Sequence, residues 1–207
     1  YLYRLNFGVR YEDFRQISVP LNADGEISGN IEEFPLLEDG FYPSLSFTWF
    51  VSEELQARFG YSSTVVRPDL REVTPVLFID PLTDFKITGF SGLKSTDVTS
   101  YVARLEWYYD ESNYSIGVFY KDLENPIESI ELQGSDGNLL MSFRNADAGE
   151  VYGVEAEFLQ QLNMFEGQSY NWLDNFFVAG NFTYSESEIT IQQFAGTNLT
   201  NLTRPLN

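Results

Sequence analysis

Glu155 and Glu157 are the residues whose type and spacing most directly suggest chemistry, because their carboxylates stand two positions apart. In a β-strand this spacing puts both side chains on one face. Glycoside hydrolysis uses two carboxyl groups about 5–9.5 Å apart, so the pair could act as an acid and a base. The alternative is a structural role, in which both glutamates pair with basic residues of neighbouring strands. We favour ion pairing, because Arg58, Arg104 and Lys121 occupy comparable positions in other predicted strands.

The residue types that are missing narrow the chemistry further. The chain of 207 residues contains no Cys and no His. Ser-His-Asp triads, thiolate zinc sites and the His-Glu-x-x-His metalloprotease motif are therefore excluded. Acidic residues are frequent in the predicted connections, but their spacing does not match a calcium-binding EF-hand loop. An enzyme with this composition would have to work mainly with carboxylates. Our expectation for this chain is no catalytic residue, no metal, no cofactor and no enzymatic role.

The charge and the apolar content exclude two further classes of protein. Asp and Glu number 31 against 12 Lys and Arg, which gives a formal net charge of −19. A general nucleic-acid binder is excluded, because it needs Lys and Arg to neutralise phosphates. A hydrophobic content of 43% and an aromatic content of 16% exclude an acidic disordered tail. No run of 18 apolar residues is present that could form a transmembrane helix.

The elements that would position the charged side chains are β-strands, because apolar residues recur with a period of two. Seven stretches show this alternation, and their apolar face carries no charge. The stretches are residues 5–11, 45–51, 55–61, 101–109, 114–120, 152–158 and 178–184. The opposite face of the predicted strands carries Arg10, Arg58, Arg104, Glu106, Lys121, Glu155 and Glu157. The sequence therefore predicts an all-β, antiparallel fold with one apolar and one polar face.

The connections between the stretches alternate in length. The shorter ones are residues 52–54, 110–113 and 159–175, and the longer ones are 13–43, 62–100, 121–150 and 185–207. Aromatic residues gather at both ends of the predicted strands, as they do at the two water–lipid interfaces of a membrane barrel. This pattern favours an outer-membrane β-barrel whose apolar face contacts lipid. A soluble β-sandwich that buries the same apolar face is the alternative, and it could bind or hydrolyse glycans.

The number of predicted strands indicates a piece of a larger barrel. Seven strands would leave two open edges, which cannot persist in lipid. Bacterial single-chain barrels also use an even number of strands, from eight upward. We therefore expect residues 1–207 to form a contiguous part of one transmembrane β-barrel domain. Residues 198–207 are expected to form a loop that leads into an eighth strand.

Three short motifs follow one another along the chain. Residues 61–72 read Tyr-Ser-Ser-Thr-Val-Val-Arg-Pro-Asp-Leu-Arg-Glu. Residues 117–122 read Gly-Val-Phe-Tyr-Lys-Asp and are followed by Asn-Pro-Ile at 125–127. Residues 152–157 read Tyr-Gly-Val-Glu-Ala-Glu. In these motifs and in their order, most of the chain resembles the barrel of TonB-dependent outer-membrane receptors.

The resemblance implies a barrel of about 22 strands, closed by an N-terminal plug, in the outer membrane of a Gram-negative bacterium. The family imports scarce ligands, such as iron–siderophore complexes, cobalamin or oligosaccharides, with energy delivered by TonB. We expect the plug, the TonB box and the remaining strands in the parent protein and not in this chain. The implied partners are membrane lipid, lipopolysaccharide, TonB and a small-molecule or oligosaccharide ligand. A porin-like barrel without a plug is the alternative within transport.

The resemblance also suggests roles for individual residues. The charged residues of the polar face would line the barrel lumen, and Glu155 and Glu157 could dock the plug. Aromatic side chains in the long connections could stack on a sugar or an aromatic siderophore, although such residues also pack loops on themselves. The candidates for ligand contact are Phe34, Tyr42, Phe85 and Phe90. For Arg67, Arg71 and Glu72 we favour salt bridges or backbone contacts at the base of a loop over a role in ligand entry.

Overall fold

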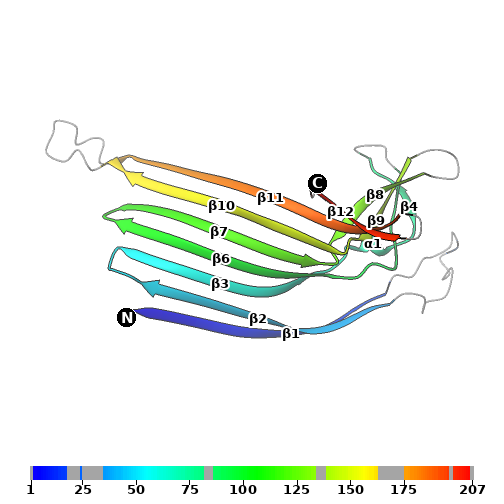
Figure 1. The fold of residues 1–207 in the computed structure, drawn as a ribbon, viewed down its shortest axis with the longest axis horizontal. Helices are drawn as coiled ribbons and strands as arrows, with labels where there is room; N and C mark the ends of the chain where they lie inside the picture. The colour runs from blue at the N-terminus through cyan, green and yellow to red at the C-terminus, as the bar shows by residue number, and fades with distance from the viewer. Residues whose placement is uncertain are drawn as a thin grey trace.

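The fold is dominated by one long antiparallel sheet (Figure 1). The computed structural model describes residues 2–17, 24, 35–81, 86–133, 139–162, 175–195 and 198–205. Eight strands of this part of the chain pair in one continuous sheet. In spatial order they are β1 (Tyr3–Gln16), β2 (Leu36–Phe50), β3 (Leu55–Val66), β6 (Thr96–Tyr109), β7 (Ser112–Glu124), β10 (Ala148–Gln161), β11 (Phe177–Ala195) and β12 (Asn198–Pro205).

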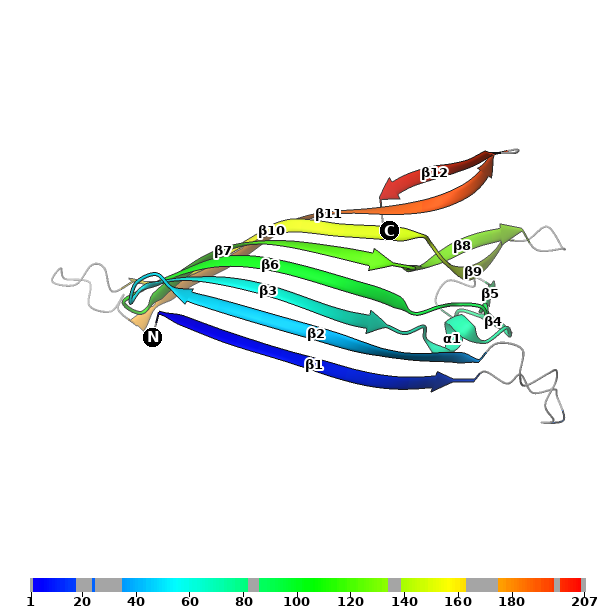
Figure 2. The same cartoon turned by 60° about the horizontal axis from the view of Figure 1, so that its bottom comes forward.

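A second, smaller sheet lies at one end of the long sheet (Figure 2). Its strands, in spatial order, are β4 (Leu77–Ile79), β5 (Lys86–Thr88), β9 (Leu139–Asn145) and β8 (Ile127–Gln133). The parallel pairing of β5 with β9 joins the connection that follows β3 to the connection that follows β7. The predicted loops 62–100 and 121–150 therefore contribute to one small folded unit. A short helix, α1 (Leu70–Val73), precedes β4, and no helix in the described ranges is long and apolar enough to cross a membrane.

The predicted all-β antiparallel fold is confirmed, and each of the seven alternating stretches lies in a separate strand of the long sheet. Only Val51 falls outside, one residue past the end of β2. The loop predicted for residues 198–207 is wrong, because Asn198–Pro205 forms β12 and pairs with β11. Leu199 and Leu202 are three positions apart and lie among Asn residues, which are depleted in strands. This segment therefore shows no alternation that could reveal a strand.

Several strands are longer than the alternation predicts. β11 runs for 19 residues and continues through Ser185-Glu-Ser-Glu188, where the apolar alternation stops. Backbone pairing continues there with β10, and β12 joins from Glu188 onward, although both faces of residues 185–188 carry polar side chains. Pro43, predicted to lie outside the strands, stands within β2 opposite Val9. It is tolerated because β2 pairs with β3 only from Ser44 onward, so no ladder bond on that side needs its missing N–H.

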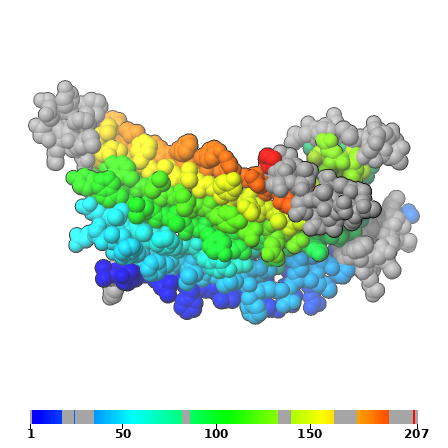
Figure 3. Space-filling model, viewed as in Figure 1, coloured from blue at the N-terminus to red at the C-terminus, as the bar shows by residue number. Residues whose placement is uncertain are grey.

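The apolar face of the long sheet has no second layer over it. Phe7, Phe41 and Phe182 are exposed by 82%, 70% and 63%, although large aromatic side chains are normally buried. The buried apolar cluster of Ala146, Ile189 and Ile191 lies instead near the small sheet. In Figure 3 the long strands appear as coloured bands that run side by side along the molecule. A β-sandwich would place a second sheet against the apolar face. The described residues provide none, so the sandwich alternative is not supported.

Aromatic side chains form rows at both ends of the apolar face. Tyr61, Tyr101, Tyr120 and Tyr152 stand directly opposite one another on four adjacent strands. At the other end, Trp107 is opposite Tyr114, six positions along both strands from the tyrosine row. Six steps at about 3.3 Å each separate the rows by roughly 20 Å along the strand. The two rows bound an apolar band, and strand tilt makes its height smaller than the ~25 Å apolar band of known membrane barrels.

A pair of arginine substitutions tests the assignment of the two faces. Ile116→Arg places a charge in the middle of the apolar band, whereas Val102→Arg places it on the polar face. In the parent protein folded into lipid vesicles, we expect Ile116→Arg to lower the free energy of unfolding by about 2–4 kcal/mol. Val102→Arg should change it by less than ~1 kcal/mol. Urea unfolding measures both values, and equal losses would show that the apolar face does not contact lipid.

Candidate functional site

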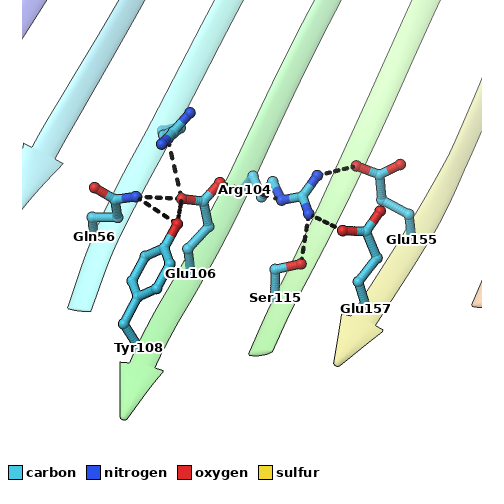
Figure 4. A network of polar contacts seen from close by, with 8 residues as sticks. Gln56, Arg104, Glu106, Tyr108, Ser115, Glu155 and Glu157 are labelled. Atoms are coloured by element: carbon cyan, nitrogen blue, oxygen red, sulfur yellow. Dashed lines mark hydrogen bonds and ion pairs between the residues drawn. The ribbon is translucent and has the colours of Figure 1, made fainter. Parts of the chain in front are cut away.

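Strand register brings the charged residues of the polar face into two adjacent rows. One row runs Arg58, Arg104, Gly117, Glu155 across β3, β6, β7 and β10. The next row runs Gln56, Glu106, Ser115, Glu157 across the same strands. Residues that are up to 101 positions apart in the sequence therefore come together in the polar network shown in Figure 4.

Glu106 is the acceptor at one end of this network. Its side chain is 10% exposed and lies beside two arginines, which stand directly opposite one another. Arg58 Nε is 3.1 Å from Oε2, and Arg104 Nε is 3.4 Å from Oε1. The Tyr108 hydroxyl donates to Oε2 at 2.9 Å, and the Gln56 amide donates to the same oxygen. Glu106 thereby offsets the repulsion that two facing arginines would otherwise exert.

Arg104 extends the network across β7 to β10. Its Nη1 lies 3.4 Å from Glu155 Oε1, and its Nη2 donates to Ser115 Oγ at 2.7 Å and to Glu157 Oε2. The strand between them carries Gly117 in the same row. A Cβ at Gly117 would stand 3.1 Å from both Cγ and Oε1 of Glu155. The missing side chain therefore leaves the space through which Arg104 reaches Glu155.

The arrangement is that of an ion-pair network and not of a hydrolytic pair. Both carboxylates that suggested glycoside hydrolysis bind the same guanidinium group. An acid and a base for glycoside hydrolysis must instead face a sugar between them. The network contains three glutamates and two arginines, which leaves one excess negative charge. A cationic group that approached this face would find a complementary surface.

A second polar cluster ties the loop after β3 to the end of β1. Glu12 pairs with both Arg10 and Arg67, at 2.8 Å each. The Arg67 guanidinium lies over the Phe14 ring at 4.2 Å, and Gln16 donates to the carbonyl of Pro68. Residues on β1 thus hold this loop across the intervening β2.

The neighbouring loop residues Arg71 and Glu72 also make local contacts. Arg71 lies over the Phe78 ring at 5.9 Å. Glu72 accepts a hydrogen bond from the backbone N–H of Asp69, which caps the first turn of α1. These contacts agree with the structural role favoured from the sequence for both residues.

The remaining candidate residues are not brought to one place. Lys121 stands on the polar face opposite Ser100 and Val151, two rows outward from Gly117. Tyr42 was predicted to lie in a loop, but it lies in β2, where it faces Arg10 at 5.5 Å. Phe90 follows β5 and is 52% exposed. Phe34 and Phe85 lie outside the described residues.

Sequence reasoning missed a cavity of about 540 Å³ between the long sheet and the small sheet. Arg67 and Glu72 line it from the α1 region, Leu123 from β7, and Glu128 and Phe143 from the β8–β9 hairpin. Two Arg67 donors, Nε and Nη2, are buried and make no hydrogen bond within the described part of the chain. A volume of this size suits a small molecule. The lining residues come from connections far apart in the sequence, and no local sequence pattern predicts that they meet.

The contact at Gly117 can be tested with a matched pair of glycines. Gly117→Ala should push Glu155 away from Arg104 and lower the free energy of unfolding by about 1 kcal/mol, the value of one hydrogen bond. Gly60→Ala is the control, because its Cβ would meet only Val102 at 3.8 Å and should shift stability by less than ~0.5 kcal/mol. Chemical unfolding of the parent protein measures the difference. Two equal effects would show that Gly117 does not make room for the network.

Comparisons with known proteins agree with this geometry. Among solved structures, the siderophore receptor PirA from Pseudomonas aeruginosa has a TM-score of 0.57 at 15% identity. The match covers 97% of this chain and 39% of that chain. A mutant of the ferric enterobactin receptor PfeA from Pseudomonas aeruginosa, in complex with enterobactin, has a TM-score of 0.53 at 18% identity. That match covers 80% of this chain and 27% of the receptor. At these identities the similarity shows a shared fold.

A family model provides the assignment. No curated protein sequence gives a match. The model described as "TonB dependent receptor-like, beta-barrel" matches residues 2–206. TonB-dependent receptors are transport proteins and not enzymes, which confirms the expectation that this chain has no enzymatic role. The chain spans about two fifths of PirA and about a quarter of PfeA. With its uncovered apolar face, its polar network and the match over nearly all of its length, the chain belongs to the barrel domain of the TonB-dependent receptor family.

Proposed function

We propose that this chain is part of the barrel wall of an outer-membrane receptor that imports a scarce ligand in a TonB-dependent manner. The observation that carries the proposal is the long sheet itself, which has an uncovered apolar face and a connected polar face in a chain of this family. In this arrangement the apolar face contacts lipid and lipopolysaccharide, and the polar face lines the lumen. The plug and the TonB-contacting box belong to the N-terminal region of the parent protein.

A ferric siderophore is the first ligand class to test. The two structural neighbours with the properties given above are named as siderophore receptors, one of them for ferric enterobactin. Cobalamin and oligosaccharides are the other ligand classes that the family imports. The identities of 15% and 18% support the fold, so the choice among these classes rests on experiment.

The cavity near the small sheet is the candidate position for ligand contact. Its Arg67 has two buried donors on one edge of the guanidinium, Nε and Nη2, while Nη1 is held by Glu12. Such an edge can donate two parallel hydrogen bonds to a carboxylate or a comparable oxygen pair. Phe90, in the same connection between β3 and β6, has an exposed ring and is a second candidate for ligand contact, outside the cavity lining.

For the polar face we propose contact with the plug of the parent protein. Glu155 and Glu157 lie at the end of a network with one excess negative charge, so a cationic side chain of the plug would find a partner there. Arg10, Arg58, Arg104, Glu106 and Lys121 would then line the lumen around this contact. A porin-like barrel, which has no plug, is disfavoured by the family match.

The transport proposal predicts ligand uptake that depends on both proteins. We expect cells that lack the parent receptor to lose uptake of its radiolabelled ferric siderophore at limiting concentration. Cells that lack TonB should show the same loss, and receptor restored on a plasmid should recover uptake only where TonB is present. A panel that includes cobalamin and an oligosaccharide tests the other classes in parallel. Uptake that persists without TonB would contradict the proposed energy source, and absence of uptake across the panel would contradict the receptor function.

The plug contact predicts a change in passive permeability. Replacing both Glu155 and Glu157 by Gln should loosen the plug while the barrel remains folded. We expect entry of a small antibiotic through the receptor to rise by about tenfold, the factor for a lost charge-assisted contact of ~1.5 kcal/mol. The control replaces Glu53 and Glu111 by Gln, since both lie exposed at short turns. Antibiotic susceptibility gives the readout, and unchanged entry at equal receptor abundance would contradict plug docking here.

A further inference from the structure

The apolar face of the long sheet contains a groove of about 780 Å³ that runs across the strands from β2 to β11. One wall is the tyrosine row, with Tyr61, Tyr101, Tyr120 and Tyr152. The other wall is the neighbouring row, which runs from Phe47 and Phe59 through Ala103 to Val118 and Val154. A groove with this lining on a lipid-facing surface accepts hydrocarbon and excludes water.

A small residue adds to the depth of the groove. Ala103 stands between Phe59 and Val118 in its row, where its methyl group leaves space between larger side chains. The walls are aromatic or branched, and many are exposed: Phe59 by 49%, Tyr101 by 49% and Val118 by 50%. The face is therefore not a flat apolar surface at this level.

A carboxylate closes one end of the groove. Glu186 stands opposite Tyr152, in line with the tyrosine row. The Tyr152 hydroxyl donates to Glu186 Oε2 at 2.8 Å, and the Tyr184 hydroxyl donates to Oε1. An ionised carboxylate accepts more than two hydrogen bonds, so Glu186 keeps acceptor capacity for a further donor. The two tyrosines hold the charge at the boundary between the apolar band and water.

The neighbouring row on the water side adds more negative charge. Glu150 stands directly between Asp122 and Glu188 in the register. On the apolar-face positions of β6, β7, β10 and β11, the described residues include no Lys or Arg. A lipid head group at this level meets a field that attracts a cationic group and repels a purely anionic one.

We propose that this groove is a lipid-binding site, which holds an acyl chain of a phospholipid whose head group carries an amine. The acyl chain lies between the two rows, and the ammonium group donates to Glu186. Charge complementarity selects this head group over an anionic head group with the same acyl chains. The inference rests on the proposed outer-membrane location of the chain, and it adds a lipid with a defined position and head-group preference.

The test measures lipid bound to the intact parent receptor. The receptor is purified, stripped of lipid in detergent and inserted into vesicles that contain phosphatidylethanolamine and phosphatidylglycerol with identical acyl chains. Native mass spectrometry then counts the lipid of each type that stays bound after extraction. We expect retained phosphatidylethanolamine to exceed phosphatidylglycerol by about fivefold, the effect of one partly exposed charge contact.

Two substitutions separate the groove from the charge. Ala103→Trp should fill the groove and abolish retention of both lipids, whereas Ala156→Trp, on the same face but outside the groove lining, should retain them. Glu186→Gln should keep lipid bound but remove the preference for the amine. Glu111→Gln removes one charge at a short turn near the opposite end of the strands and should leave the preference unchanged.

The outcomes distinguish this inference from the proposed function. Heat-dependent electrophoretic migration reports whether the receptor has folded into the vesicles. If the wild-type receptor fails to insert, the membrane function itself is contradicted. If it inserts but binds both lipids equally, or if Ala103→Trp retains as much lipid as Ala156→Trp, the lipid site is overturned and the transport proposal stands.

Discussion

Backbone hydrogen bonding is the constraint on which the rest of this structure depends, because lipid offers no partner to an unpaired N–H or C=O. Eight strands pair in one continuous sheet, which meets the constraint in its interior, while β1 and β12 have a neighbour on one side only among the described residues. Continuous pairing fixes the register, and the register decides which face each side chain occupies. Because Phe59 is paired with Ala103, Arg58 must share the other face with Arg104. A slip of one residue would turn these arginines toward lipid. The alternation of apolar residues therefore fixes both the apolar face and the positions of the polar network.

The polar network shows how the same register creates a problem and supplies its solution. Direct pairing puts two arginines face to face, and Glu106, one row away, bridges them. Gly117 then allows Arg104 to reach two glutamates on β10, so one guanidinium links three strands. Glycines on a polar strand face are usually unfavourable, since they weaken strands. Here the loss of strand stability is offset by ion pairs that side chains on adjacent strands alone could not form.

Sequence alternation predicted the strands only where water and lipid lie on opposite sides of the chain. Leu5–Tyr11 and Tyr114–Tyr120 are such segments, and both were placed correctly. Residues 185–188 of β11 are polar on both faces, so the alternation ended there and the extension of the strand was not predicted. The strand position of Tyr42 and the whole of β12 were not predicted either. The charged residues were assigned to the correct face. The contact between Arg104 and Glu157 could not be predicted, because it depends on how β6 and β10 are each aligned with β7. The parallel pairing of β5 with β9 joins two connections that are far apart in the sequence, and no local pattern predicts it.

Strand register shows where part of the net charge of −19 lies in the structure. Glu186 stands in the tyrosine row, and Asp122, Glu150 and Glu188 stand in the next row outward. Carboxylates opposite one another repel, so this row reduces the stability of the pairing that carries it. Such facing carboxylates are tolerated only where water screens the repulsion between them. Acidic residues therefore begin where the lipid ends. Their level on each strand follows from the same balance of hydration and burial that places the tyrosine rings at the interface.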